Sequence, residues 1–437
     1  MSGLTVLVVG AGARQHALCW RLAAEAGVGH IIVAPGNPLI HDVAEMRADV
    51  DGEDVGAIVA LAVAEHVDLV VVGPEDPLVG GLADRLADVG IACFGPSAAA
   101  ARLEGSKAFA REVCRAAGVS MARGRAFTDS RSAIEFAATL DAPLVVKADG
   151  LAGGKGVTIA ASLGEAERAI RESLESGRFG GAGAMVVVEQ YLSGREASVF
   201  ALCDGTSYAL LPAARDHKRA FDLDGGPNTG GMGAFSPVPE LDDAALSAIG
   251  EMIVAPVLRE MEGRGAPFRG VLFCGLMLTS DGPRVLEFNI RFGDPEAQAI
   301  LPRVDVPLAQ LMLECATGRL TASGVLPVHP LATVALVLAA DGYPETARRG
   351  DVIRGIEAAR AGGALVFGAG VARDDDGELV TAGGRVLTVV GTGADVAAAA
   401  DAAYAAADLI DYAAKWSRRD IGRALEASAV AGPGVAF

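Results

Sequence analysis

The first hundred residues alternate apolar strand patterns with helical patterns, and this alternation limits the possible fold more than any other feature of the chain. Strands that alternate with helices along the sequence indicate a doubly wound parallel sheet. In such sheets the loops after the carboxyl ends of the strands gather at one edge, where ligands bind. We predict strands at 4–9, 30–33, 68–72 and 91–94, and helices at 14–25, 55–65 and 82–88.

The pattern changes at Ser106, and prolines near residue 328 mark a second change. We expect an N-terminal doubly wound α/β domain at 1–105, a central α+β domain at 106–328 and a smaller mixed α/β domain at 329–437. The glycine-rich, charged segment 215–237 is typical of a functional loop. Further strands are predicted at 144–148, 157–160, 185–190, 197–202, 271–278, 284–290, 332–339, 364–368 and 386–390, and helices at 107–117, 242–262, 395–407 and near Asp420, before a frayed tail.

The chain is acidic, and its cysteines are scattered. A net charge of −18 over 437 residues repels nucleic acid, which disfavours DNA or RNA as a main partner. No apolar run approaches the ~18 residues that span a bilayer, and no basic segment precedes the first strand, so we expect neither a membrane span nor a secretory signal. Six cysteines without paired spacing predict a reduced, cytoplasmic protein without disulfides or a zinc site.

The loop after the first strand, GAGARQ, is similar to a dinucleotide-binding turn but incomplete. That fingerprint needs Gly or Ala where this chain has Gln15. It also needs an acid after the second strand, where the chain runs into APGN at 34–37. The start of the following helix, with Gly12, still suits a single phosphate. We therefore expect an anion site here rather than a dinucleotide site.

A glycine-rich hairpin follows Lys147. The segment KADGLAGGKGV (147–157) is no Walker A loop, because Asp149 stands where that motif needs its first Gly and Gly156 where it needs Ser or Thr. Backbone N–H groups at such a tip can cover phosphates, and lysines add charge. A flexible hairpin with solvated lysines explains the pattern equally well. The tip contains Gly150, Gly153, Gly154, Lys155 and Gly156.

Oxygen-bearing side chains recur at predicted strand ends. Glu189 can accept from an exocyclic amine and Glu196 from ribose hydroxyls, although two exposed acids near a turn would look the same. Glu287 and Asn289 lie two apart on a predicted strand and share one face, from which Arg291 also projects. Oxygen ligands at this spacing suit Mg²⁺, which binds few protein groups together with phosphates. A buried ion-pair cluster is the alternative.

The segment 215–237 combines a charged tetrad with glycines. Asp216 to Arg219 can hold an amine and a phosphate at once, or can simply face solvent. The glycines at 230, 231 and 233 favour close approach of the backbone to another group. His217, within the tetrad, is the one histidine that we single out.

Taken together, these motifs resemble those of the ATP-grasp ligases and, within them, the glycinamide ribonucleotide synthetase family. The matching stretches include VVGPEDPLV, LEGSKAF, KADGLAGGKGV, GPNTGGMGA, EFNIRFGDPE and RRDIG, and they extend from residue 6 to about residue 425. The resemblance implies an ATP-grasp architecture with a lid subdomain at about 123–192. It also implies a reaction in which ATP, glycine and 5-phosphoribosylamine give glycinamide ribonucleotide, ADP and phosphate, in purine synthesis.

The resemblance further implies roles for individual residues. Lys107 and Lys147 would contact the ATP phosphates, with the loop of Gly153, Gly154, Lys155 and Gly156 folded over them. Glu189 and Leu192 would bind adenine, Glu196 the ribose, and Glu287 and Asn289 a Mg²⁺ or Mn²⁺ ion. Arg291, Lys147 and Asp294 are the expected catalytic residues. The expected substrate-binding residues are Gly12, Asn37, Glu75, Asp216, Lys218, Arg219, Asn228 and Thr229.

The chain departs from the family pattern at four positions. Gln15 replaces the usual Glu, Gly153 a frequent Ala, Gly368 an expected His and Val371 an expected Thr. We expect small-molecule partners only, and a monomer or weak homodimer. The rival functions are another ATP-grasp enzyme such as a biotin-dependent carboxylase, a nicotinamide-dependent oxidoreductase, and a non-catalytic nucleotide-binding protein.

Overall fold

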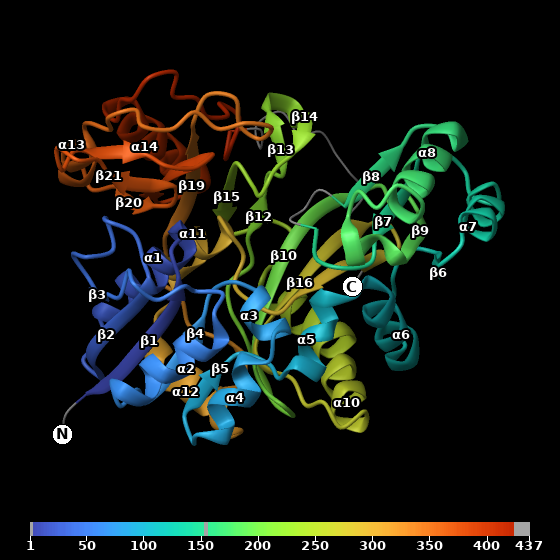
Figure 1. The fold of residues 1–437 in the computed structure, drawn as a ribbon, viewed down its shortest axis with the longest axis horizontal. Helices are drawn as coiled ribbons and strands as arrows, with labels where there is room; N and C mark the ends of the chain where they lie inside the picture. The colour runs from blue at the N-terminus through green and yellow to red at the C-terminus, as the bar shows by residue number, and fades with distance from the viewer. Residues whose placement is uncertain (1–2, 153–155, 424–437) are drawn as a thin grey trace.

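The computed structural model describes residues 3–152 and 156–423. The N-terminal domain is built on a five-stranded parallel sheet in the order β3-β2-β1-β4-β5, which confirms the predicted doubly wound α/β class (Figure 1). The two-residue strand β3 and the helices α3 and α5 lie outside the predicted elements. The strands are β1 (Leu4–Gly10), β2 (Val28–Pro35), β3 (Glu45–Met46), β4 (Leu69–Val72) and β5 (Ala92–Phe94), and the helices are α1 (Ala13–Ala23), α2 (Val55–Ala64), α3 (Asp76–Val79), α4 (Leu82–Asp88) and α5 (Ala98–Gly105).

The central sheet has the order β17-β16-β10-β11-β18, with antiparallel pairing from β17 through β11. One face packs against the N-terminal sheet and helix α6, because Leu7, Val70, Val113 and Leu276 belong to one apolar core. The elements are β10 (Arg195–Asp204), β11 (Tyr208–Leu210), β16 (Arg269–Thr279), β17 (Gly282–Asn289), β18 (Gly324–Val325), α6 (Lys107–Ala117), α9 (Asp243–Ile249), α10 (Ala255–Gly263), α11 (Glu296–Ile300) and α12 (Leu308–Thr317).

A second sheet of the central region, in the order β6-β9-β7-β8, has a core of its own. Its buried apolar residues, among them Phe127, Leu144, Ile170 and Val188, all lie between residues 127 and 188. With α7 and α8 it protrudes on the side away from the N- and C-terminal domains (Figure 1). The elements are β6 (Gly124–Phe127), β7 (Leu144–Ala148), β8 (Val157–Ala160), β9 (Val186–Gln190), α7 (Ser130–Ala137) and α8 (Leu163–Leu174).

The segment 215–237 is not irregular throughout, contrary to the prediction of a loop. It contains four short strands, because its backbone pairs with neighbouring strands, and such pairing overrides the weak strand propensity of glycine. Strand β15 pairs with β12 on one side and β19 on the other, which joins the segment to the C-terminal sheet. The strands are β12 (Arg215–Asp216), β13 (Arg219–Phe221), β14 (Gly225–Asn228) and β15 (Gly233–Ser236).

The C-terminal sheet has the order β12-β15-β19-β23-β20, and α14 packs on β23 and β19. The described residues on either side of Asp420 do not form the helix predicted there: residues 421–423 form a turn, and Asp420 accepts hydrogen bonds from Arg418 and from the Leu223 N–H at 2.9 Å. The predicted frayed tail, residues 429–437, lies outside the described residues. The elements are β19 (Ala332–Ala339), β20 (Leu365–Gly368), β21 (Val371–Arg373), β22 (Leu379–Thr381), β23 (Arg385–Gly393), α13 (Ile356–Ala361) and α14 (Val396–Leu409).

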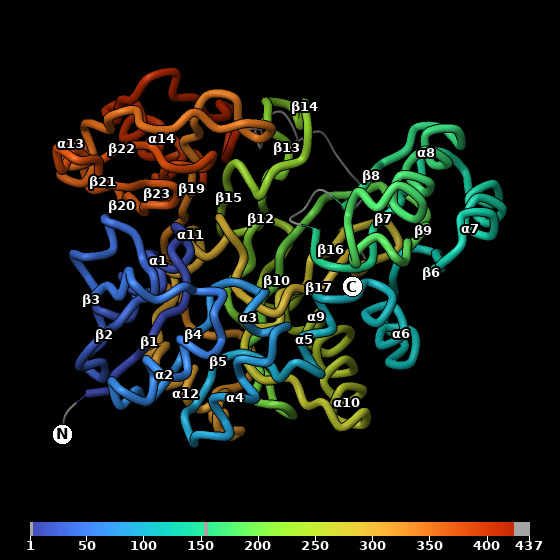
Figure 2. Tube along the Cα trace, viewed as in Figure 1, coloured from blue at the N-terminus to red at the C-terminus, as the bar shows by residue number. Residues whose placement is uncertain are grey.

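The N- and C-terminal domains meet where α1 lies beside β20 (Figure 2). The Gly368 N–H donates to His16 Nδ1 at 2.9 Å, and the Gly368 carbonyl accepts from Asn37 Nδ2 at 2.9 Å. A Cβ atom at residue 368 would lie 2.7 Å from Asn37 Oδ1 and 3.0 Å from Leu39 Cδ1, so these two side chains occupy the space that a larger residue would need. This close approach explains why Gly stands where the family pattern predicts His.

Two compositional predictions can be compared with the structure. All six cysteines are buried and free, as their spacing predicts. Across residues 3–152 and 156–423, no helix combines the length and the apolarity that crossing a bilayer requires.

Candidate active site

A cavity of about 950 Å³ lies where the three domains and the β6–β9 sheet meet. The N-terminal domain contributes Arg14 and Glu75, the β6–β9 sheet Lys147 and Glu189, and the C-terminal domain Arg385. Its size and its position at the carboxyl ends of the N-terminal strands are those of a small-molecule site.

At one end of the cavity, Glu189 holds two cations. Glu189 forms an ion pair with Lys147 from the neighbouring strand β7 and accepts from Arg111 Nη1 at 2.9 Å. Lys147 Nζ also donates to the Leu286 carbonyl at 3.0 Å. Arg111 was not predicted, although it lies one helical turn after Lys107 on α6, and that spacing is a signal for a shared face.

Lys107 is placed by a cap at the start of α6. The Ser106 hydroxyl accepts the Phe109 N–H at 3.1 Å, and Asp149, just after β7, accepts the Ala108 N–H at 2.7 Å. These bonds hold the first turn of α6 next to the end of β7. Burial lowers the pKa of Lys107. Two lysines from separate elements therefore face one part of the cavity, where they can neutralise phosphates.

Lys218 lies among three carboxylates in the middle of the cavity. Its Nζ is 3.3 Å from Glu196, 3.7 Å from Glu287 and 3.9 Å from Asp216. Burial raises the pKa of Asp216 to about 8, against the opposite effect of Lys218 and with the help of Glu296. Asp216 therefore holds a proton more readily than an exposed aspartate does.

Glu287 and Asn289 both line the cavity from strand β17. Burial alone would raise the pKa of Glu287, but Lys218, Lys147 and Lys107 lower it below its usual value. Ionised Glu287 and the amide oxygen of Asn289 are the hard oxygen donors that Mg²⁺ and Mn²⁺ prefer. Within the described residues, no group of three or more His, Cys, Asp or Glu side chains could hold a metal ion. The donor set fits an ion that takes its other ligands from phosphates and water.

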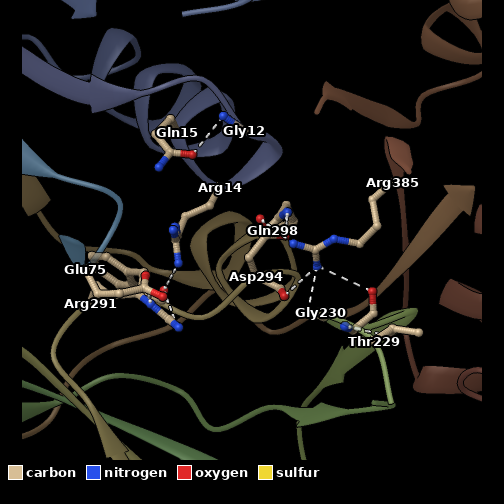
Figure 3. Close-up of polar contacts among 12 residues, drawn as sticks. Gly12, Arg14, Gln15, Glu75, Thr229, Gly230, Arg291, Asp294, Gln298 and Arg385 are labelled. Atoms are coloured by element: carbon tan, nitrogen blue, oxygen red, sulfur yellow. Dashed lines mark hydrogen bonds and ion pairs between the residues drawn. The ribbon is translucent and has the colours of Figure 1, made fainter. Parts of the chain in front are cut away.

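Arg291, just beyond β17, is held by two carboxylates, and Figure 3 shows one of them, Glu75, beside it. Its Nε is 3.0 Å from Glu75 and its Nη2 is 3.0 Å from Glu104. Glu104 also accepts the Ile290 N–H at 2.8 Å. Burial raises the pKa of Glu104 to about 7, whereas Arg291 and Arg14 outweigh burial at Glu75 and lower its pKa to about 2. Glu104 was not predicted, because it belongs to a helix that the sequence pattern did not reveal.

Asp294 is fixed by an arginine from the C-terminal domain (Figure 3). Arg385 Nη2 is 3.2 Å from the Asp294 carboxylate, and Arg385 Nη1 donates to the carbonyls of Gly230 at 2.7 Å and Asp294 at 2.8 Å. Gln298 donates to Asp294 at 2.8 Å. Burial raises the pKa of Asp294, but Arg385 and Arg14 outweigh it, so the net shift is downward. Nothing in the sequence around Arg385 signalled this contact.

The remaining predicted residues of the ATP and glycine sites also line the cavity where they are described. Thr229 donates to the Lys218 carbonyl from its N–H at 2.7 Å and from its hydroxyl at 2.8 Å. His217 is neutral, because burial lowers its pKa to about 4, and its Nδ1 has no hydrogen-bond partner within the described residues. Gly153, Gly154 and Lys155 lie outside the described residues. The other lining residues of this set are Gly156, Leu192, Arg219 and Asn228.

Two predicted sugar-binding residues do not line the cavity. The Gly12 N–H donates to Gln15 Oε1 at 3.0 Å, so the loop is closed by a side chain of its own helix (Figure 3). Asn37 donates to the carbonyls of Ala11 at 2.6 Å and Gly368 at 2.9 Å, and accepts the Leu39 N–H at 3.0 Å. These bonds make Asn37 a structural link between domains.

Models of one protein family match all three domains of this chain. The family models described as phosphoribosylglycinamide synthetase match as N domain at 4–104, ATP-grasp (A) domain at 105–297 and C domain at 333–424. A phosphoribosylamine–glycine ligase from Caulobacter vibrioides is 47% identical, covering 98% of this chain and 100% of that protein. The corresponding ligase from Phenylobacterium zucineum is 46% identical over 96% of this chain and 99% of its own.

Solved structures show the same similarity. The phosphoribosylamine–glycine ligase of Thermotoga maritima superposes with a TM-score of 0.84 at 32% identity, covering 96% of this chain and 100% of that one. A biotin carboxylase from Campylobacter jejuni shares the fold, with a TM-score of 0.71 at 16% identity over 97% and 95% of the two chains. The chain belongs to the phosphoribosylglycinamide synthetase family.

Proposed function

We propose that the protein joins glycine to 5-phosphoribosylamine at the expense of ATP, giving glycinamide ribonucleotide, ADP and phosphate. The observation that carries this proposal is the alignment of Glu287, Asn289 and Arg291 along one wall of a cavity. At one end of this wall lie Lys107 and Lys147, which can bind phosphates. At the other end Arg291 contacts Glu75 of the N-terminal domain. The names of the most similar relatives support the choice of substrates.

The reaction has two steps. The carboxylate of glycine takes the γ-phosphoryl group of ATP, forming glycyl phosphate and releasing ADP. The amine of phosphoribosylamine then attacks the glycyl carbonyl carbon, and phosphate leaves with the electrons of the broken C–O bond as the amine loses a proton. Such transfers depend on alignment and charge neutralisation more than on a protein nucleophile.

At the nucleotide end, we assign Lys107 and Lys147 to the ATP phosphates. Glu287 and Asn289 would hold Mg²⁺ or Mn²⁺, which neutralises phosphate charge when bound. Glu189 retains unused lone pairs beyond its two ion pairs and can accept from the adenine amine. Glu196 would accept from the ribose hydroxyls, Leu192 would lie against the adenine ring, and residues 153–156 would cover the phosphates.

Between the two ends, Arg291 would stabilise the transferring phosphoryl group. Asp294 suits the ammonium group of glycine better than Asp216 does, because Arg385 and Arg14 lower the pKa of Asp294 whereas burial raises that of Asp216 to about 8. The polar groups that remain near them, which would help to position the substrates, are Lys218, Arg219, Asn228 and Thr229.

At the sugar end, Glu75 is our candidate acceptor for the hydroxyls of phosphoribosylamine. Gly12 and Asn37 receive no such role, since their polar groups bind other parts of the chain. We also propose a cytoplasmic location, which free, buried cysteines favour, and a monomer or weak homodimer.

The test is phosphate release from ATP, with each substrate omitted in turn and the product identified by mass. We expect release only when glycine and phosphoribosylamine are both present, with glycinamide ribonucleotide as product. Release that depends on bicarbonate instead of glycine would assign the protein to the carboxylases, whose fold it shares.

A further inference from the structure

Arg14 is a buried cation that lacks a carboxylate partner. It lies in the first turn of α1, is only 8% exposed and lines the cavity. Its Nη1 donates to the Phe292 carbonyl at 2.8 Å, whereas its Nε has no partner within the described residues. Figure 3 shows the side chain extending from α1 toward Glu75 and Arg291. Buried donors normally find partners, so this one indicates a ligand.

The acids around Arg14 are already bound to other arginines. Glu75 and Glu104 pair with Arg291, and Asp294 pairs with Arg385. No carboxylate of the described chain lies within ion-pair distance of Arg14. Burial and Arg291 lower the pKa of Arg14 to about 10, so it still carries its charge at neutral pH. A bound oxyanion would satisfy both the charge and the free donor.

The neighbouring glycine loop is closed to such an anion. Gln15 Oε1 takes the Gly12 N–H, and the Gln15 side chain fills the space beside Gly10 and Gly73, where an added Cβ would lie 2.5 Å and 1.9 Å from Gln15 Nε2. An anion at this end of the cavity therefore meets the guanidinium of Arg14 rather than the loop backbone. The 11-residue helix α1 adds the positive end of its dipole nearby.

We propose that Arg14 binds the 5′-phosphate of phosphoribosylamine, as the main anion contact of the sugar end. This inference rests on the proposed function. A phosphate monoester carries more charge than a carboxylate and matches the planar donor fork of arginine. The carboxylate of glycine shares the oxyanion chemistry, and the experiment separates the two sources.

The test compares Arg14→Gln and Arg14→Lys with the wild type. We expect the apparent KM for phosphoribosylamine to rise about ten- to a hundredfold in Arg14→Gln and less in Arg14→Lys, with those for glycine and ATP within about twofold. The dissociation constant of ribose 5-phosphate, measured by calorimetry, should rise in parallel. Arg85→Gln, which removes the same charge from an exposed position on α4, is the control and should change none of these constants.

The outcomes separate this inference from the proposed function. An unchanged KM for phosphoribosylamine in an active Arg14→Gln protein overturns the inference, and a rise in the KM for glycine alone assigns Arg14 to the carboxylate instead. If the wild type makes no glycinamide ribonucleotide, the proposed function fails. Ribose 5-phosphate then still decides, since equal binding to wild type and Arg14→Gln refutes the phosphate contact. Equal unfolding midpoints show that the variants are folded.

Discussion

The two ends of the cavity hold their charges in different ways. At the nucleotide end, Glu189 forms ion pairs with Lys147 and Arg111. At the sugar end, Arg291 is paired twice, but Arg14 beside it has no ion pair with any described residue. A nucleotide must therefore compete with the ion pair of Lys147, whereas a sugar phosphate meets a guanidinium that is buried and has no carboxylate partner among the described residues. The sugar end is the better prepared for an anion.

The nucleotide end gives the largest expected effect. Glu287→Ala should lower kcat by more than about a hundredfold. Mutation of a residue that only hydrogen-bonds to a metal ligand already lowers activity about ten- to a hundredfold, and Glu287 is proposed to bind the metal itself. Phosphate release measured at several Mg²⁺ concentrations tests this. Exposed Glu135→Ala on α7 is the control. Wild-type turnover by a folded Glu287→Ala protein would refute the metal assignment.

Glu75 and Glu104 sharpen the comparison at the sugar end. Both pair with Arg291, but we assign only Glu75 to the sugar hydroxyls. Glu75→Ala should raise the apparent KM for phosphoribosylamine about ten- to a hundredfold and leave that for ATP much less changed. Glu104→Gln should act through Arg291 and lower kcat without that rise in KM. Identical kinetic patterns in the two variants would mean that Glu75 only positions Arg291.

Gln15 tests whether the first loop is closed. Gln15→Ala removes the acceptor of the Gly12 N–H and leaves a space beside Gly10 and Gly73, which should lower the free energy of unfolding by about 1–3 kcal/mol. Gln15→Glu keeps an acceptor at the same place and should lose much less. Denaturant unfolding measures both. If Gln15→Ala is as stable as the wild type, the side chain does not hold the loop.

His16 gives the smallest effect, a pH dependence of stability. Burial lowers its pKa from 6.5 to about 3, so the unfolded chain binds this proton first as the pH falls. Stability that is present above pH 6.5 is therefore lost as the pH falls toward 3, by about 1 kcal/mol between pH 7.5 and pH 6. His16→Asn keeps an acceptor for the Gly368 N–H and should show a flatter profile. An unchanged profile would contradict this account.

The sequence predicts β1, β2, β4 and β5 of the N-terminal sheet and β19, β20 and β23 of the C-terminal sheet, because apolar runs are bounded there by glycine and polar residues. It does not predict β3, β12 and β15, which are too short to show an apolar run. It does not predict Arg111, Glu104 or Arg385 at the cavity, because each meets its partner across a long stretch of chain. Arg385, for example, reaches Asp294 over 91 residues. The expectation for Gly12 depends on the loop being open, and only the packing of the Gln15 side chain decides that. A pattern of neighbouring residues in the sequence cannot predict contacts between residues that are far apart in it.

The distribution of apolar cores decides which parts of the molecule can move relative to one another. One core contains Leu18 of the N-terminal domain, Phe200 of the central sheet and Phe367 of the C-terminal domain, so a hinge between these parts would expose apolar surface to water. The β6–β9 sheet has a separate apolar core, so its displacement relative to the other domains would not expose that core to water. Lys147 and Glu189 belong to this sheet, so a displacement of it relative to the other domains would alter the nucleotide end of the cavity and leave the sugar end unchanged. The sugar end is therefore the more rigid of the two ends, because the domains that form it share one apolar core.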